Sequence, residues 1–249
     1  MAVAIIPARG GSKRLPGKNI RPFAGKPLLV HSVELAQRVR AVDRILVTTD
    51  DAKTAQIAAE AGAEVVMRPA ELSTDHSTTA SAIRHALTTA YGAAALPNAV
   101  VTLQPNCPLR SAAMVADAIR RFEEGDADSV VSVTLGRHKL GTIEGGCFVP
   151  RYRTGTRSQD MAPEYYENGV IYVSSARMVV EREDLFGARM TPMVIDELYA
   201  LGDIDTELDF RVAEFLFHAY RAKFEEEKDS PEDAASGRAQ RGNSWTSFG

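Results

Sequence analysis

Short runs of Val and Ile alternate along the chain with longer segments in which apolar residues recur every three or four positions. The short runs predict strands at residues 3–7, 44–48, 64–67, 99–103 and 129–133. The longer segments predict helices at 28–39, 52–61, 78–91 and 112–124, two of them preceded by capping residue types, Ser111 and the pair Asp50 and Asp51. This alternation predicts an α/β fold with a doubly wound, mostly parallel sheet.

The pattern changes after the fifth predicted strand. Scattered glycines, Pro150, Pro163 and several basic residues interrupt any regular spacing between residues 136 and 167, which predicts a small inserted lobe. Strand-like runs return at 170–174 and 191–195, and residues 206–224 have helical spacing. From residue 225 the chain is polar, as is typical of a disordered tail. We therefore expect one domain over residues 1–224, with its lobe at 136–167, and a tail at 225–249.

Composition and charge narrow the classes of function. The balance of 29 Lys and Arg against 33 Asp and Glu gives a net charge of -4, so we expect neither nucleic acid nor a membrane as partner, and any anion site must be local. The sequence shows no apolar run of membrane-spanning length and no signal-peptide pattern at its start. Its two cysteines, Cys107 and Cys147, lack metal-binding spacing. This favours free thiols in a cytoplasmic protein.

A glycine-rich basic segment, RGGSKRLPGKN, directly follows the first predicted strand. Ligands of open α/β sheets bind beyond the carboxyl ends of the strands, where such a loop can enclose phosphate. The glycines would allow close backbone approach, and the cations would bind a triphosphate: Gly10, Gly11, Arg9, Lys13 and Lys18. The spacing matches neither G-x-G-x-x-G nor the P-loop, because Pro16 stands at the second P-loop glycine. An ordinary solvated basic turn is the alternative.

Several segments in fixed order point to a family. The segments IIPARGGSKRLPGKN, RPAELSTD, LQPNCPLR, ENGVIYV and DIDTELDF follow one another along the chain. With them, the chain resembles the acylneuraminate cytidylyltransferases, the CMP-sialic acid synthetases, from about residue 3 to residue 210. The resemblance implies a Rossmann-like nucleotidyltransferase fold, CTP as co-substrate, Mg²⁺ as cofactor, an acidic sugar as acceptor and a homodimer that pairs through the inserted lobe.

The resemblance also implies roles for residues on the nucleotide side. The residues expected to bind CTP are Arg9, Gly10, Gly11, Ser12, Lys13, Lys18, Asn19, Arg68 and Thr79. Those expected to take part in catalysis are Arg9, Lys18, Gln104 and Asp205. Cations placed in advance at the phosphates would stabilise the charge that builds on the leaving pyrophosphate. For Arg68 alone, a surface salt bridge is the alternative.

Two carboxylates near the C-terminus suggest a metal site. DIDTELDF places Asp203 and Asp205 two residues apart on one side of an extended segment. Such a pair can share Mg²⁺ with phosphate oxygens, and the resemblance assigns metal binding to these two residues. The alternative is an acidic cluster at a helix N-terminus, which suits Glu207 and Asp209 better.

The resemblance, together with the cations of the lobe, indicates an acceptor region. Its expected residues are Gln104, Asn106, Lys139, Arg157, Gln159, Asn168 and Gly169, of which Lys139 and Arg157 would meet the sugar carboxylate. Asn106 and Cys107 stand where Thr and Ser are usual in the family. A covalent role for Cys107 is disfavoured, because no paired His is evident. The segment 132–159 is shorter than the family pattern, which leaves a smaller acceptor open.

These observations predict a cytidylyltransferase that joins CMP from CTP to the anomeric hydroxyl of a sialic-acid-like nonulosonic acid and releases pyrophosphate. Transfer to an octulosonic acid or a small phosphonate is the alternative within this class. A non-catalytic CTP-binding regulatory protein is the alternative outside it. Retention of Asp203 and Asp205 disfavours that second alternative, because CTP sensing needs no two-carboxylate metal site. No general base is evident.

Overall fold

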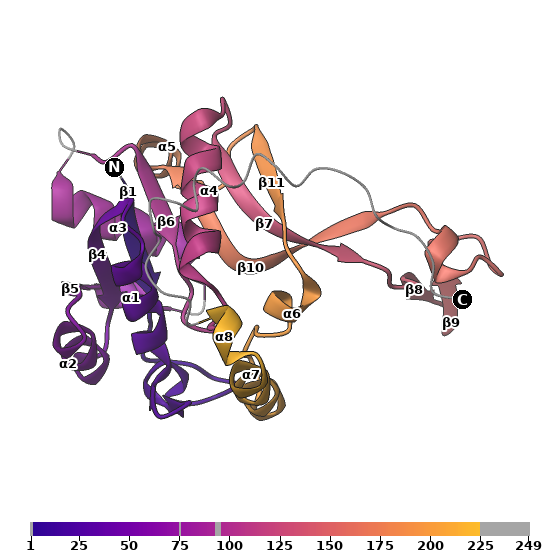
Figure 1. Ribbon diagram of the computed structural model, residues 1–249, viewed down its shortest axis with the longest axis horizontal. Helices are drawn as coiled ribbons and strands as arrows, with labels where there is room; N and C mark the ends of the chain where they lie inside the picture. Colours follow the sequence, from indigo (N-terminus) through magenta and orange to yellow (C-terminus); the bar gives the residue numbers. More distant parts are fainter. Residues whose placement is uncertain (1, 75, 93–95, 225–249) are drawn as a thin grey trace.

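The computed structural model describes residues 2–74, 76–92 and 96–224, so the predicted tail at 225–249 lies outside the described residues. Its main sheet has seven strands in the order β11-β7-β10-β6-β1-β4-β5 (Figure 1). Their bounds are β1 (Ala2–Pro7), β4 (Val42–Thr49), β5 (Glu64–Met67), β6 (Ala99–Thr102), β7 (Ser129–Gly136), β10 (Glu164–Ser175) and β11 (Met190–Val194). Of these strands, β10 pairs antiparallel with β6 and β7, and the other pairs are parallel. The predicted mostly parallel sheet is confirmed.

The helices predicted for the first half of the chain are present. The helices are α1 (Leu28–Arg38), α2 (Ala52–Glu60), α3 (Thr79–Tyr91), α4 (Ala112–Glu124), α5 (Ala176–Arg182), α6 (Glu197–Ala200), α7 (Glu207–Ala219) and α8 (Arg221–Phe224). Asp51 caps α2 and Ser111 caps α4, as expected, because their side chains accept the backbone N–H of Thr54 and Met114. Within the described chain, no helix combines the length and the apolar character of a membrane span.

Helices cover both faces of the sheet, and the side-chain alternation of β1 shows how. Ala4 and Ile6 belong to one buried cluster together with residues of α1, α2 and α4. Val3 and Ile5, which point to the opposite face, belong to a second cluster with residues of α3 and α5. The carboxyl end of β1 is therefore held between two packed layers, and the loop that follows it starts from a fixed point.

A third apolar cluster fixes the loop after β1 against the C-terminal helices. Leu15 of this loop and Phe23 pack with Phe210 and Phe217 of α7. Phe23 ends strand β2 (Pro22–Phe23), which pairs with β3 (Lys26–Pro27) in a small separate sheet, and its ring meets that of Phe210 edge-on at 5.5 Å. Segments about 190 residues apart in sequence are thus joined beside the sheet.

The expected inserted lobe is a projecting β arm (Figure 1). Strand β7 continues to Gly136 and β10 already begins at Glu164, and these ends pair with each other. The arm also contains the hairpin of β8 (Gly141–Glu144) and β9 (Cys147–Pro150). Its surface exposes several large apolar side chains: Leu140, Ile143, Phe148, Val149 and Tyr165. The irregular spacing of the sequence hid these strands, because neither face of the arm is buried in the domain core.

Candidate active site

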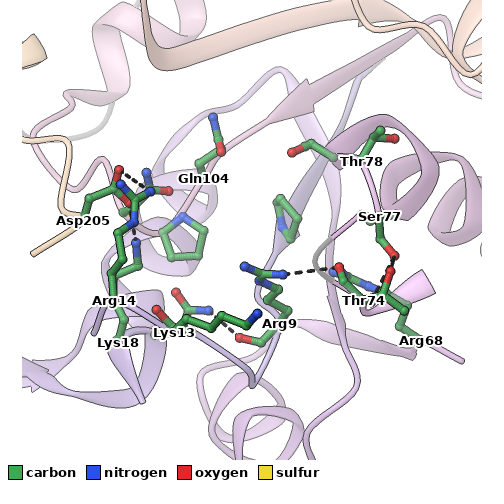
Figure 2. A pocket seen from close by; sticks show the side chains of 17 residues that line it. Arg9, Lys13, Arg14, Lys18, Arg68, Thr74, Ser77, Thr78, Gln104 and Asp205 are labelled. Carbon is green, nitrogen blue, oxygen red and sulfur yellow. Dashed lines mark hydrogen bonds and ion pairs between the residues drawn. The ribbon is translucent and has the colours of Figure 1, made fainter. Parts of the chain in front are cut away.

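A cavity of about 560 Å³ opens at the carboxyl ends of β1 and β6 (Figure 2). Its walls come from the loop after β1, the segment leading into α3, the loop after β6 and the segment before α7. The lining residues are Pro7, Arg9, Ser12, Lys13, Arg14, Lys18, Asn19, Arg68, Thr74, Ser77, Thr78, Thr79, Ala82, Gln104, Pro105, Asn106 and Asp205. The structure therefore brings together most residues predicted to bind nucleotide, including Arg68 and Thr79 from distant segments. We call this space the basic cavity.

Hydrogen bonds hold the loop after β1 in place around the basic cavity. The Asn19 side chain donates to the carbonyl of Arg9 at 2.9 Å, which closes the loop across its base. Lys18 donates to the carbonyl of Ile204 at 2.5 Å and lies 3.3 Å from Asp205. Because Leu15 is buried in the third cluster, the loop backbone that carries Arg14 and Lys18 is anchored to the domain.

Gly10 makes a close packing contact that the sequence did not predict. The Gly10 N–H donates to the Asp50 carboxylate at 2.9 Å, and a Cβ at Gly10 would lie 2.6 Å from the Cβ of Asp51. Gly10 thus allows the loop to pack against the N-terminus of α2. Neither Gly10 nor Gly11 lines the basic cavity. Their role in phosphate binding stays a prediction.

Arg68 is a buried wall of the basic cavity. Its guanidinium donates to the Thr48 carbonyl at 2.9 Å and to the Thr48 hydroxyl at 3.4 Å. Burial lowers the pKa of Arg68, an effect that the charge of Asp50 opposes. A surface salt bridge, the alternative from the sequence, does not describe a side chain that is 8% exposed.

The carboxylate of Asp205 pairs with two cations of the loop. Arg14 lies 2.8 Å from one oxygen of Asp205, and Lys18 lies 3.3 Å from the other. Figure 2 shows these three side chains on one side of the cavity, with Arg9 and Arg68 toward the other. Sequence reasoning missed Arg14, although it stands beside Lys13 in the same basic segment.

Asp203 is held by the loop after β6. Asn106 donates to Asp203 at 2.6 Å, and the Ile204 N–H donates to the Asn106 carbonyl at 2.8 Å. Burial raises the pKa of Asp203, and the negative charge of Asp205 adds to this effect. Cys107 lies 4.0 Å from the same carboxylate oxygen, and burial raises the pKa of its thiol to about 12. A protonated thiol agrees with the expectation that Cys107 is not a nucleophile.

A second cavity of about 450 Å³ adjoins the basic cavity. It shares Gln104, Asn106 and Asp205 with the first, and we call it the acceptor-side cavity. Its full lining is Gln104, Asn106, Tyr166, Glu167, Asn168, Gly169, Tyr172, Ala200, Asp203 and Asp205. The predicted residues Gln104, Asn106, Asn168 and Gly169 therefore meet here. Sequence reasoning missed Tyr166, Glu167 and Tyr172.

The predicted cationic residues of the acceptor region lie elsewhere in this chain. Lys139 is in the arm, with its ammonium 5.6 Å from the centre of the Tyr152 ring. Arg157 forms an ion pair with Asp160 at 2.6 Å. Gln159 and Asp160 belong to the short helix η3 (Ser158–Asp160), which follows Arg157. Lys139, Arg157 and Gln159 line neither of the two cavities. Their contact with substrate stays a prediction.

Asp203 and Asp205 have the donor chemistry of a divalent cation site. Both carboxylates face the acceptor-side cavity, and Asp205 also lines the basic cavity. The repulsion that contributes to the raised pKa of Asp203 is the kind that a shared cation relieves. In the described parts of the chain, no group of three or more His, Cys, Asp or Glu side chains gathers for a metal. The residues fit an ion that takes its remaining ligands from phosphate and water.

Several known proteins are similar to this chain in sequence. A family model described as cytidylyltransferase matches residues 3–230. An N-acylneuraminate cytidylyltransferase of Streptococcus agalactiae is 32% identical over 235 residues, which are 91% of this chain and 56% of that protein. This chain thus spans about half the length of that relative. A CMP-N,N'-diacetyllegionaminic acid synthase of Legionella pneumophila is 31% identical over 226 residues, which are 86% of this chain and 95% of that protein.

Solved structures share the fold. The structure of CMP:2-keto-3-deoxy-manno-octonic acid synthetase complexed with CTP superposes with a TM-score of 0.66 at 18% identity, over 88% of this chain and 98% of that one. A 4-diphosphocytidyl-2C-methyl-D-erythritol synthase superposes with a TM-score of 0.64 at 14% identity, over 87% of this chain and 97% of that one. The predicted Rossmann-like nucleotidyltransferase fold is confirmed.

Proposed function

Because the chain belongs to the cytidylyltransferase family, we propose that it transfers CMP from CTP to the anomeric hydroxyl of a sialic-acid-like nonulosonic acid and releases pyrophosphate. The supporting observation is the junction of the two cavities. The basic cavity and the acceptor-side cavity meet at Gln104, Asn106 and Asp205. A phosphate at this junction has cations on one side and a space for an attacking hydroxyl on the other.

The nucleotide occupies the basic cavity in this proposal. Arg9, Lys13, Arg14 and Lys18 bind the triphosphate, and Lys18 is held in place by the Ile204 carbonyl. These cations stabilise charge as it moves to the leaving pyrophosphate, so their effect is larger in the transition state than in the ground state. Gln104 lies at the junction, beside both reacting groups.

Asp203 and Asp205 hold Mg²⁺ in this proposal. When bound, the ion supplies positive charge at the α-phosphate and lowers the pKa of the attacking hydroxyl. Arg14 and Lys18 form ion pairs with Asp205. Phosphates that attract these two cations would free the carboxylate, so nucleotide and metal binding should strengthen each other.

We propose that the protein acts in the cytoplasm as a homodimer, with the arm as the contact between subunits. The exposed apolar side chains of the arm, among them Ile143 and Phe148, support this, because monomeric proteins rarely expose such groups together. In a dimer formed through the arm, Lys139, Arg157 and Gln159 would lie near the partner subunit, where they could reach an acidic acceptor bound to that subunit. Sedimentation of the full chain tests this: a monomer at micromolar concentration would contradict it.

The test of the reaction uses the full chain with CTP, Mg²⁺ and a panel of acids: N-acetylneuraminic, legionaminic, pseudaminic and octulosonic acids and a small phosphonate. Pyrophosphate release is followed, and products are identified by mass. Asp205→Asn should lower turnover at least about 100-fold while the fold is kept, since it removes charge at the reacting phosphate. Asp43→Asn, an exposed carboxylate on β4, is the matched control and should be unchanged.

The outcomes separate the alternatives. Transfer only to the octulosonic acid or the phosphonate would keep the chemistry and change the acceptor. CTP binding without pyrophosphate release for any acid would favour the regulatory alternative. A fully active Asp205→Asn variant would refute the metal assignment.

A further inference from the structure

The acceptor-side cavity contains a carboxylate to which the reaction above gives no role, that of Glu167. The pairing of β10 with β7 changes register between Glu167 and Tyr172. Because of this irregularity, two side chains five positions apart both line the cavity, although regular alternation would place them on opposite faces. The Tyr172 hydroxyl donates a short hydrogen bond to Glu167.

Asn168 holds this irregularity in place. Its side-chain oxygen accepts from the Ser132 hydroxyl at 2.6 Å and from the Val170 N–H at 3.1 Å, and its nitrogen donates to Thr134 at 2.9 Å. The amide is therefore used by the protein itself. Asn168 therefore fixes the backbone between Glu167 and Tyr172, and the side chains of Glu167 and Tyr172 are the ones that can contact a ligand in the cavity.

The Glu167–Tyr172 pair offers hydrogen-bond acceptors. An ionised carboxylate has no proton to donate, and the only proton of the Tyr172 hydroxyl is directed at Glu167. Burial and the neighbouring Glu167 raise the pKa of Tyr172, so the phenol keeps that proton at neutral pH. A ligand group that faces the pair must bring its own hydrogen-bond donor.

Charge sets the orientation of an anionic acceptor in this cavity. Its described lining includes the carboxylates of Glu167, Asp203 and Asp205 and no Lys or Arg. A substrate carboxylate beside Glu167 would meet like charge, whereas the cations Arg14 and Lys18 lie toward the basic cavity. The acid group of an acceptor in this cavity would therefore point away from Glu167, and its neutral polar substituents would face this residue.

We propose that Glu167, oriented by Tyr172, is a specificity-determining residue that binds a hydroxyl or amide N–H on the neutral part of the acceptor. This inference rests on the proposed function, because it assumes that the acceptor occupies this cavity. It selects sugars rich in hydrogen-bond donors over small acids without them.

Glu167→Gln tests the proposal, since it keeps the size of the side chain and removes its charge. With N-acetylneuraminic acid, the acceptor KM should rise about tenfold, as expected for loss of a hydrogen bond to a charged group, while the KM for CTP changes less than twofold. Glu164→Gln, an exposed glutamate of the same strand, is the matched control and should match the wild type. An unchanged acceptor KM in Glu167→Gln would overturn the proposal.

Acceptor analogues identify the donor and exclude a merely structural effect. Analogues of N-acetylneuraminic acid that each lack one hydroxyl, or the amide N–H, are compared in the wild type and in Glu167→Gln. With the wild type, kcat/KM for one analogue should be about tenfold lower than for N-acetylneuraminic acid. With the variant, kcat/KM for the same two acids should be nearly equal, because the contact is already absent. Equal losses in both enzymes for every analogue would overturn the role of Glu167. Absence of wild-type turnover with every acid would instead overturn the proposed function, and this inference with it.

Discussion

Replacing Gly169 with Ala tests how the acceptor-side cavity depends on backbone conformation. Gly169 has a φ of +72°, in the left-handed region, where Ala costs about 1–2 kcal/mol of folding free energy. For a chain of this size, that loss lowers Tm by roughly 2–8 °C. The new methyl would lie 3.4 Å from the Gln104 amide nitrogen and 3.7 Å from the Tyr172 hydroxyl. It would thus occupy space between two walls of the cavity without a severe clash.

Gly155→Ala separates the two effects. Gly155 also has a positive φ, of +84°, but a methyl there meets no atom within 4 Å. Both variants should lose stability in thermal denaturation, and in steady-state assays only Gly169→Ala should raise the acceptor KM, by about tenfold, with the KM for CTP unchanged. If Gly169→Ala has wild-type acceptor kinetics, or if both variants lose activity equally, the assignment of this cavity to the acceptor is refuted.

Three further predictions concern stability and reactivity. Asp51→Ala should lower the free energy of unfolding by about 1 kcal/mol at pH 7 in urea denaturation, since the cap of α2 is lost. Hydrogen bonds from Thr54 lower the pKa of Asp51, so the difference in stability between wild type and variant should shrink as pH falls through that lowered pKa. A difference that does not depend on pH would contradict this. Asp203→Asn should abolish turnover yet raise the Tm measured without ligands at pH 7, because burial raises the pKa of Asp203 and its ionised form destabilises the fold. The gain should shrink as pH falls through that raised pKa and vanish below the ordinary pKa of a carboxyl group, and a lower Tm at pH 7 would argue against it. Cys107, with a thiol pKa of about 12, should resist iodoacetamide at pH 8 in the folded protein and react once it is unfolded, as intact mass shows; rapid labelling of the native thiol would be inconsistent with its burial.

The sequence predicted well which residues gather around the basic cavity, because they lie in contiguous segments next to buried strands. Arg9 and Lys18 follow β1, and Gln104 follows β6, so the edge of a parallel sheet brings them together. Asp205 also joined this edge, although it is distant in sequence. Arg14 was missed because nothing in a basic run distinguishes the cation that pairs with a carboxylate from its neighbours.

The lining of the acceptor-side cavity and the strands of the arm were predicted less completely, for two physical reasons. Glu167 and Tyr172 reach the same cavity through a change in strand register, which depends on tertiary pairing with β7 and leaves no local pattern. The arm forms strands whose two faces lie outside the core, so the alternation that marks a half-buried strand is absent. For that reason the lobe that contains Lys139 and Arg157 was predicted from the sequence, but its strands were not.

The most direct measurement is pyrophosphate release from CTP and Mg²⁺ by the full chain in the presence of N-acetylneuraminic acid, with the product identified by mass. A CMP-linked sugar, formed by the wild type and by Asp43→Asn and lost in Asp205→Asn, is the predicted result. Tight CTP binding without release of pyrophosphate, with every acid of the panel, would contradict a catalytic role for the junction between the two cavities.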